Sequence, residues 1–406
     1  MLIDGSGRMG RGVAYSTTEP AHLLNVRAEG MSAWAGDPDQ FARRYAEEGG
    51  EPRGFAQRRF FACYLGELLD QAVASGNVEL VEATVTKGAR NGGTWKIELD
   101  DGSTVDAEAL VLAVGNQEPA ALDAFGGTGS RFIGNPWDRD AQKAIAELAA
   151  SGEAALLVGT GLTMVDLVLS LEASGHQGRI VALSRRGLAP RAHGDFEPAS
   201  VEASELPRGL RDLFRWLRRQ SAQLGWRAAI DSLRPHSHQI WQGLEHEEHR
   251  RFLRHVRPWW DVHRHRIAPE VGATIARLVA ESRLEIVAGR IVAAIDTPDG
   301  IEVEYRRRGV SASRTEPFAY VFNCTGPLHS ISRTKNSLLR SLLDAGEAKP
   351  DHLDIGVEVD GTCRAGEHLW AMGPLTKGRY WEIIAVPDIR EQAAEVADQI
   401  AKELKA

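Results

Sequence analysis

The segment Ala154–Arg191, AALLVGTGLTMVDLVLSLEASGHQGRIVALSRRGLAPR, decides the fold of this chain. A short apolar run, Ala155–Val158, ends in Gly159-Thr160-Gly161. An apolar helical pattern follows from Leu162 to about Ala173, and a second apolar run covers Ile180–Leu183. The order strand, tight glycine turn, helix and strand is typical of a unit that binds a pyrophosphate at a helix N-terminus.

Each glycine in this segment has a physical role. Gly159 permits a sharp turn out of the strand, and Gly161 lets a phosphate approach the backbone because it has no side chain. The helix that starts there directs its free N–H groups and positive dipole end at the phosphate. Met164 occupies the position of the third glycine in G-x-G-x-x-G, so the match is incomplete, although the flanking strand and helix support it.

The end of the second strand indicates which cofactor is preferred. NAD sites usually carry Asp or Glu there, whereas this chain has Ser184-Arg185-Arg186. A carboxylate would repel a 2′-phosphate and arginine would pair with it, so the sequence predicts NADPH rather than NADH. The alternative is that both arginines are solvated loop charges.

Composition excludes several classes of protein. The 406 residues are enough for two domains, and the net charge of −8 with no compensating basic face argues against nucleic acid as a partner. Three widely spaced cysteines, Cys63, Cys324 and Cys363, match no metal spacing and suggest a reducing compartment. Without a signal peptide or an apolar run of bilayer length, the sequence predicts a cytoplasmic protein with no membrane partner.

Three further segments give structural predictions: the N-terminus, residues 100–102, and residues 195–285. Met1-Leu2-Ile3-Asp4 resembles the end of a strand that finishes in an acid, a place where dinucleotide-binding units hold a ribose; Asp4 could equally be a loop acid. Asp100-Asp101-Gly102 predicts a hairpin turn. Residues 195–285 are expected to be helical, with one helix over Glu245–His255 that Pro258 stops.

The residues also carry a resemblance to a known family. The matching runs are Gly10–Ser16, His22–Val26, Met31–Ala33, Val158–Asp166, Ala182–Gly187, Arg254–Pro269 (RHVRPWWDVHRHRIAP), Asn323–Pro327 and Val386–Ala393. Together they resemble a bacterial family of FAD/NAD(P)-binding proteins over nearly the whole chain. That family is related to the flavin-containing and N-hydroxylating monooxygenases, which have two dinucleotide-binding domains, and a urate hydroxylase has been assigned among similar sequences.

The resemblance implies an α/β fold with two Rossmann-like domains, the NADPH domain being inserted in the FAD domain. The expected ranges are 1–136 for the first part of the FAD domain, 137–326 for the NADPH domain with its helical insertion, and 327–406 for the return to the FAD domain. By position, the residues implied to contact FAD are Asp4, Arg11, Gly12, Asn25, Val85, Gly115, Asn116 and Gly373. Those implied to contact NADPH are Gly159, Gly161, Thr163, Ser184, Arg185 and Arg186.

One departure from the family concerns the start of the chain. Relatives have a strand and a G-x-G-x-x-G helix before the position of Asp4, and this sequence lacks them. That element would supply the central strand of the FAD sheet and a helix dipole for the pyrophosphate. The expectation is therefore a shortened N-terminus and, for the sequence as it stands, weak or absent FAD binding.

The chemistry expected is that of the cofactors, with the protein positioning them. No catalytic acid–base pair can be assigned, and no metal site is expected. His263, His265 and Trp259 lie in the densest cluster of histidine and aromatic residues and are candidates for a substrate pocket; a structural helix turn is the alternative. Cys324 has no second cysteine nearby, so a disulfide reductase is disfavoured.

The sequence thus predicts an FAD-dependent NADPH oxidoreductase, in particular a monooxygenase that hydroxylates a small polar molecule with molecular oxygen. The alternatives are an NADP(H)-binding protein without flavin catalysis and a flavin-dependent reductase that does not oxygenate. The sequence indicates neither the substrate nor the oligomeric state.

Overall fold

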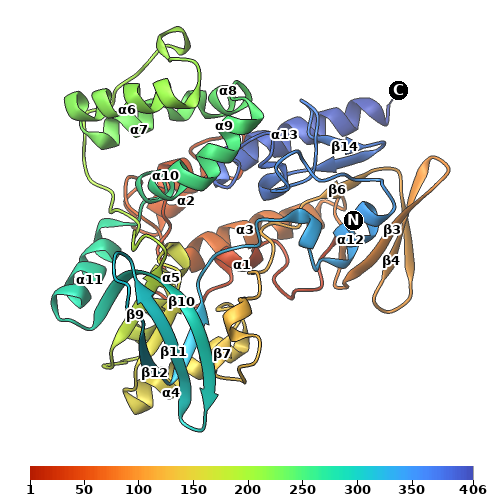
Figure 1. Ribbon diagram of the computed structural model, residues 1–406. Coiled ribbons are helices and arrows are strands. Elements are labelled where there is room, and N and C mark those ends of the chain that lie inside the picture. The colour runs from red at the N-terminus through yellow and green to blue at the C-terminus, as the bar shows by residue number, and fades with distance from the viewer. Residues whose placement is uncertain (406) are drawn as a thin grey trace.

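The computed structural model describes residues 1–405, and its largest sheet has seven strands in the order β12-β11-β10-β9-β8-β13-β7 (Figure 1). These strands are β7 (Phe132–Ile133), β8 (Ala155–Val158), β9 (Ile180–Ser184), β10 (Leu284–Thr297), β11 (Gly300–Arg307), β12 (Arg314–Phe318) and β13 (Tyr320–Asn323). From β10 to β7 the neighbours are parallel, and β10, β11 and β12 form an antiparallel meander. β10 is one continuous strand, and β7 joins this sheet although it precedes residue 136, the expected end of the first part of the FAD domain.

The opening segment folds as predicted, with β8, a glycine turn, α5 (Leu162–Ala173) and β9 in succession. Both strands are apolar on each face because helices cover one side of the sheet and the meander the other. The helices on the first side are α4 (Arg139–Ser151), α5 and α11 (Pro269–Ala280). Gly159 has φ +119°, and a Cβ there would lie 2.2 Å from the carbonyl oxygen of Cys324, so only glycine can make this turn.

The remaining strands form three smaller sheets. A parallel pair joins β1 (Leu2–Ile3) and β2 (Leu80–Val81); a second sheet has the order β14 (Arg364–Gly366), β15 (Leu369–Ala371), β6 (Leu110–Leu112); a third contains β3 (Val85–Asn91), β4 (Thr94–Leu99) and β5 (Thr104–Ala107). Within residues 1–405, β1 pairs only with β2 and β6 only with β15. The predicted hairpin turn at 100–102 connects β4 to β5.

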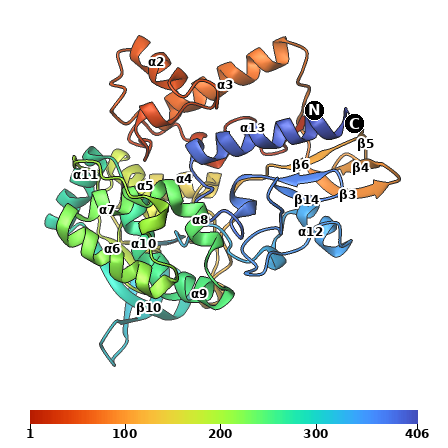
Figure 2. The same ribbon diagram turned by 90° about the horizontal axis from the view of Figure 1, so that it is seen from above.

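We call β1, β2, β6, β14 and β15 the split region, because these strands form two sheets that are not hydrogen-bonded to each other. The split region and the third sheet share a core that includes Trp95, Leu112, Leu339 and Leu369. Helix α12 (Ser337–Asp344) packs on this core, whereas α13 (Val386–Glu403) packs through Val396 against Trp370 of β15. Helices α2 (Gln40–Glu47) and α3 (Arg58–Ala74) share a separate core, and α1 (Gly12–Tyr15) lies against α3. Figure 2 shows α3 and α13 on the same side of these strands.

A buried ion pair connects α3 to α5, the helix that follows the Gly159 turn. Arg58 donates to both carboxylate oxygens of Asp166 on α5, each at 2.9 Å. The side chains are only 12% and 8% exposed. His22 adds a bond from its Nε2 to the carbonyl oxygen of Asp166 at 2.9 Å. The N-terminal part of the chain is therefore fixed directly to α5.

The helical content expected for residues 195–285 is confirmed, with one correction. The helices there are α6 (Leu210–Leu224), α7 (Trp226–Ser232), α8 (Ser237–Gln242), α9 (His246–Arg251) and α10 (Arg257–Arg264). Pro258 does not stop a helix: a π-helical segment over Phe252–Val256 leads into α10, and Pro258 lies in its first turn. Proline is tolerated there because the first N–H groups of a helix have no intrahelical acceptor.

Among the described residues, no helix has both the length and the apolar character required to cross a membrane.

Candidate functional site

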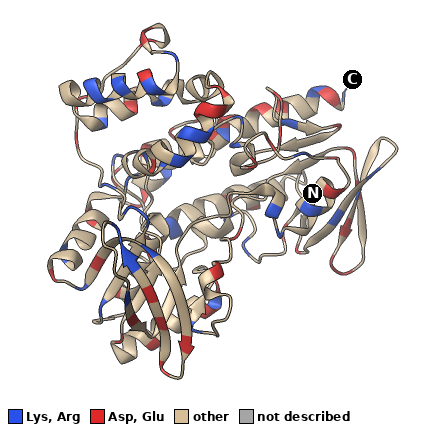
Figure 3. Ribbon diagram, in the orientation of Figure 1, with Lys and Arg blue, Asp and Glu red and all other residues tan. Residues whose placement is uncertain are grey.

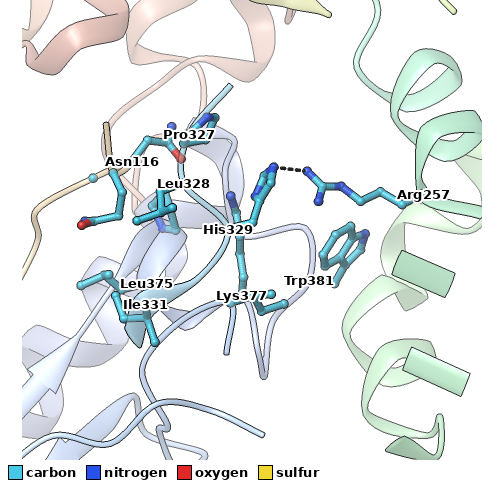
Figure 4. A pocket seen from close by; sticks show the side chains of 13 residues that line it. Asn116, Arg257, Pro327, Leu328, His329, Ile331, Leu375, Lys377 and Trp381 are labelled. Atoms are coloured by element: carbon cyan, nitrogen blue, oxygen red, sulfur yellow. Dashed lines mark hydrogen bonds between the residues drawn. The ribbon is translucent and has the colours of Figure 1, made fainter. Parts of the chain in front are cut away.

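A pocket lies where the loops after β6, β13 and β15 meet the start of α10 (Figure 4). Gly115 and Asn116 follow β6, His329 follows β13, and Lys377 follows β15. Arg257 reaches the pocket from the first residue of α10. In parallel α/β proteins, ligands bind beyond the carboxyl ends of the strands, which is where these loops lie.

Arg257 is held by two partners beside this pocket. Its Nε donates to Asp261 Oδ2 at 3.2 Å, and one terminal nitrogen lies 3.0 Å from Nε2 of His329. Because a guanidinium can only donate, Nε2 of His329 must be the acceptor, and the ring is neutral with its proton on Nδ1. Burial, followed by the positive charges of Arg257, Lys377 and Arg185, lowers the pKa of His329 to about 3.

Lys377 and Trp381 carry donors without partners. Burial, with a smaller effect of Arg257, lowers the pKa of Lys377 to about 8, while Asp261 and Glu382 oppose that shift. Among the side chains described, none forms an ion pair with Lys377 within 4.0 Å. The indole Nε1 of Trp381 is buried and has no hydrogen-bond acceptor. Such orphaned donors are rare in folded proteins and mark places where a ligand or water completes the bonding.

The second candidate site is the glycine turn between β8 and α5. Gly161 is the N-cap residue of α5, which has no side-chain cap, and a Cβ on Gly161 would meet no atom within 4 Å. The first N–H groups of the helix therefore face open space at its positive end. Thr163 is partly exposed in the first turn. These residues fit a dinucleotide pyrophosphate, as the sequence predicts.

The residues that follow β9 differ in their availability. The Ser184 hydroxyl accepts the N–H of Gly187 at 3.0 Å and lies 2.8 Å from the Thr160 hydroxyl, so it shapes the turn. Arg186 donates to the carbonyl oxygen of Arg254 at 3.1 Å. Arg185 is exposed and has no ion pair or hydrogen bond in the described chain, so it is the freer of the two arginines to meet a phosphate.

The residues expected around FAD are spread over the split region and its surroundings. Asp4 follows β1, and its carboxylate accepts the Ser6 N–H at 2.8 Å. Arg11 and Gly12 are exposed at the start of α1, and Val85 begins β3. Of the expected set, only Gly115 and Asn116 line the pocket.

Asn25 and Gly373 complete that set. The carbonyl oxygen of Asn25 lies 3.0 Å from Nε2 of His193, and the N–H of Gly373 donates to Gln392 Oε1 at 2.6 Å. α1, which follows β1 and a run of glycines, is a short helix. Among the described residues, no other strand of the split region is followed directly by a glycine turn and a longer helix. Of the strands in the split region, β1 and β6 are followed by residues expected to contact FAD, namely Asp4 after β1 and Gly115 and Asn116 after β6.

The three candidates for a substrate pocket do not line the pocket of Figure 4. Trp259 is 43% exposed, and His263 bonds through Nδ1 to the carbonyl oxygen of Trp259 at 2.7 Å. His265 lies with its Nε2 3.9 Å from Asp261. Arg257, two residues before Trp259, does line the pocket, and the sequence analysis missed it.

The cysteines form no redox pair. Cys63 is exposed, Cys324 and Cys363 are buried, and all three are free. Burial raises the pKa of the Cys324 thiol, with a further contribution from the Asp166 charge. Residues 1–405 also contain no group of three or more metal-ligating side chains.

Comparisons with known proteins agree with this architecture. Residues 1–117 match a family model described as FAD-NAD(P)-binding. No curated protein sequence is significantly similar to the chain.

Solved structures of low sequence identity share the fold. L-lysine 6-monooxygenase from Pseudomonas syringae has a TM-score of 0.68 at 18% identity, covering 98% of this chain and 90% of that one. Reduced ornithine hydroxylase from Pseudomonas aeruginosa has a TM-score of 0.66 at 16% identity, with 100% and 92% covered. Ornithine N-hydroxylase from Kutzneria sp. 744, with reduced FAD, NADP+ and L-ornithine, has a TM-score of 0.61 at 14% identity, with 97% and 90% covered. The chain therefore has the fold of flavoenzymes with two dinucleotide-binding domains.

Proposed function

We propose that this chain is an FAD-dependent NADPH oxidoreductase, in particular a monooxygenase that hydroxylates a small polar molecule. The observation that carries the proposal is the β8–Gly159-Thr160-Gly161–α5 unit, with a free Arg185 where an NAD enzyme would carry an acid. The match of residues 1–117 to an FAD-NAD(P)-binding family supports FAD as the second cofactor. The similar folds of ornithine and lysine hydroxylases support the reaction class.

Each cofactor is assigned to its own part of the chain. Residues 137–326 bind NADPH, with the first turn of α5 on the pyrophosphate and Arg185 on the 2′-phosphate. Residues 1–136 and 327–406 bind FAD, with Asp4 on a ribose and Gly115 near the ring. NADPH supplies a hydride and FAD supplies a ring that accepts it and reacts with oxygen. Pro327 and Leu375 supply apolar surface to the pocket of Figure 4.

The decisive experiment is a visible absorbance spectrum of the purified chain, with and without added FAD. We expect flavin bands from bound FAD when FAD is added in excess, and NADPH oxidation that depends on oxygen and on substrate. NADPH should bind more tightly than NADH. A protein that stays colourless with FAD present, while still binding NADPH, would refute the enzyme proposal.

A matched variant tests whether α5 holds the pyrophosphate. Gly161→Ala adds a methyl group that touches no protein atom within 4 Å, so folding should be unaffected. The methyl group should nevertheless block the approach of a phosphate to the backbone and weaken NADPH binding about tenfold or more. Unchanged NADPH affinity in Gly161→Ala would place the cofactor elsewhere.

The second candidate is an NADP(H)-binding protein without flavin catalysis. The specific observation in its favour is the split region, whose two sheets share no hydrogen bond within the described chain. Substrate-independent NADPH oxidation in a flavin-loaded protein would instead favour the reductase that does not oxygenate.

A further inference from the structure

The polar groups of the pocket in Figure 4 are mostly donors. Lys377 offers an ammonium group, Trp381 an indole N–H without an acceptor, and His329 the N–H of its Nδ1. Arg257 retains N–H groups beyond the two that bond Asp261 and His329. Asn116 and Gln117 carry both donors and acceptors, and no aspartate or glutamate lines the pocket. A ligand that supplies acceptors therefore matches most of the polar side chains there.

The pocket also has an excess of positive charge. Asp261 pairs with Arg257 and compensates part of its charge. Lys377 has no such partner among the described residues, although it is largely shielded from water. A buried cation without a counter-ion costs free energy, and that cost is recovered when an anion binds beside it. An ammonium group in the same place would add like-charge repulsion to the deficit of acceptors.

The size of the pocket limits what enters. The pocket is partly open to solvent, and its volume of about 30 Å³ is enough for a few water molecules. One small polar group of a ligand can therefore enter it while the rest of the ligand stays outside. The groups around it come from β6, β13, β15 and α10, so the pocket forms only when both regions of the chain are assembled.

Resting on the proposed function, we propose that this pocket binds an anionic group of the substrate, a carboxylate or another small oxyanion, through Lys377, Arg257 and the indole N–H of Trp381. The substrate class is therefore a small organic acid. The same donors could instead serve a negatively charged edge of the flavin, so the test separates these two sources.

The test uses acetate as the anionic probe and methylammonium as its cationic counterpart. Binding of each ¹³C-labelled probe to the full chain is followed by NMR line broadening. We expect acetate to bind and methylammonium not to bind. Lys377→Gln should weaken acetate binding by about ten- to hundredfold, because a hydrogen bond to a charged group contributes about 1.5–3 kcal/mol. The control is Lys349→Gln, which removes an exposed lysine outside the pocket and should leave acetate binding unchanged.

Two further variants separate loss of binding from loss of structure. Trp381→Phe keeps an aromatic ring and removes only the orphaned N–H, and should weaken acetate binding severalfold. Lys377→Arg keeps the charge and should restore most of the binding lost in Lys377→Gln. Equal acetate affinity in the wild type and Lys377→Gln, or binding of methylammonium, would overturn the proposal.

The pH dependence supplies an independent readout. The charged groups around Lys377 are Arg257, Asp261 and Glu382, and the pKa of Lys377 is lowered to about 8. A bound anion favours the protonated amine, so acetate binding takes up protons near pH 8 and weakens as the pH rises through that value. The Lys377→Arg protein should show no such loss, because arginine stays charged.

The last experiment tests whether the donors of the pocket bind the substrate or the flavin. Acetate is titrated into the chain with and without saturating FAD. Retained acetate binding supports a substrate site, whereas complete displacement of acetate by FAD overturns the proposal and assigns the donors to the flavin. The acetate titration without FAD requires no cofactor. Its result therefore still tests the anion site if the proposed oxidoreductase function is wrong.

Discussion

The seven-stranded sheet and the split region differ in how firmly their central strands are held. In the first, β8 is paired on both sides, and Leu156 of β8 and Val181 of β9 are 0% exposed. In the second, β6 has one partner in the described chain, and its Val111 is 37% exposed although the run around it is apolar. A strand that is hydrogen-bonded to a neighbour on each side keeps the glycine turn after it in one position. A strand with one unpaired edge does not constrain its turn in this way.

The glycines that end these strands differ in the same way. The turn at Gly159 is in contact with the backbone of Cys324, at the end of β13. Gly115 after β6 also has a positive φ, +66°, but a Cβ there would meet no atom within 4 Å. The first glycine is required by its surroundings and the second only by its own backbone conformation.

Substitution of these two glycines is the strongest test of that contrast. Gly159→Ala should lower the free energy of unfolding by about 4 kcal/mol, because it combines backbone strain with a clash against a carbonyl group. Gly115→Ala should cost about 1–2 kcal/mol, the penalty of a left-handed conformation alone. Urea unfolding followed by circular dichroism measures both values. Equal costs would mean that the two strand ends are equally constrained.

The contact between α3 and α5 tests whether the two regions fold together. Arg58→Ala leaves the carboxylate of Asp166 buried without its partner, and should cost about 3 kcal/mol. If the regions are coupled through this pair, hydrogen exchange should increase in both α3 and α5. Arg59→Ala is the control, since Arg59 is exposed and bonds only to Gln57 in the same segment. Exchange that rises in α3 alone would show two independent units.

The same division separates what the sequence could predict from what it could not. The elements β8, α5 and β9 could be predicted because they are contiguous in the chain and each residue type in them has a local physical role. The pocket could not be predicted, since Arg257 lies on α10 while His329 and Lys377 follow β13 and β15, and only the folded chain brings these segments together. Pro258 was misjudged because the pattern gave no sign of the π-helical segment that starts a new helix there.

At the proposed NADPH site, the structure distinguishes two arginines for which the sequence predicts the same role. Arg185→Ala should weaken NADPH binding by about 2 kcal/mol, roughly thirtyfold, because Arg185 is free to pair with the 2′-phosphate. NADH binding should not change. Arg186→Ala should have a smaller effect on the preference, because Arg186 already bonds the carbonyl oxygen of Arg254. Fluorescence titration with both nucleotides measures the ratio, and a larger effect for Arg186 would reverse the assignment.

The smallest expected effect concerns the exposed strand of the split region. Val111→Thr should change the free energy of unfolding by about 0.5 kcal/mol or less, since the new hydroxyl remains in water. Val181→Thr buries the same hydroxyl in β9 without a designed partner and should cost about 2 kcal/mol. The two substitutions are chemically identical, so their difference reports only on what covers each strand. A cost at Val111 that rises to the Val181 value would mean that β6 is covered in solution, and repeating the measurement with saturating FAD would show whether the cofactor is what covers it.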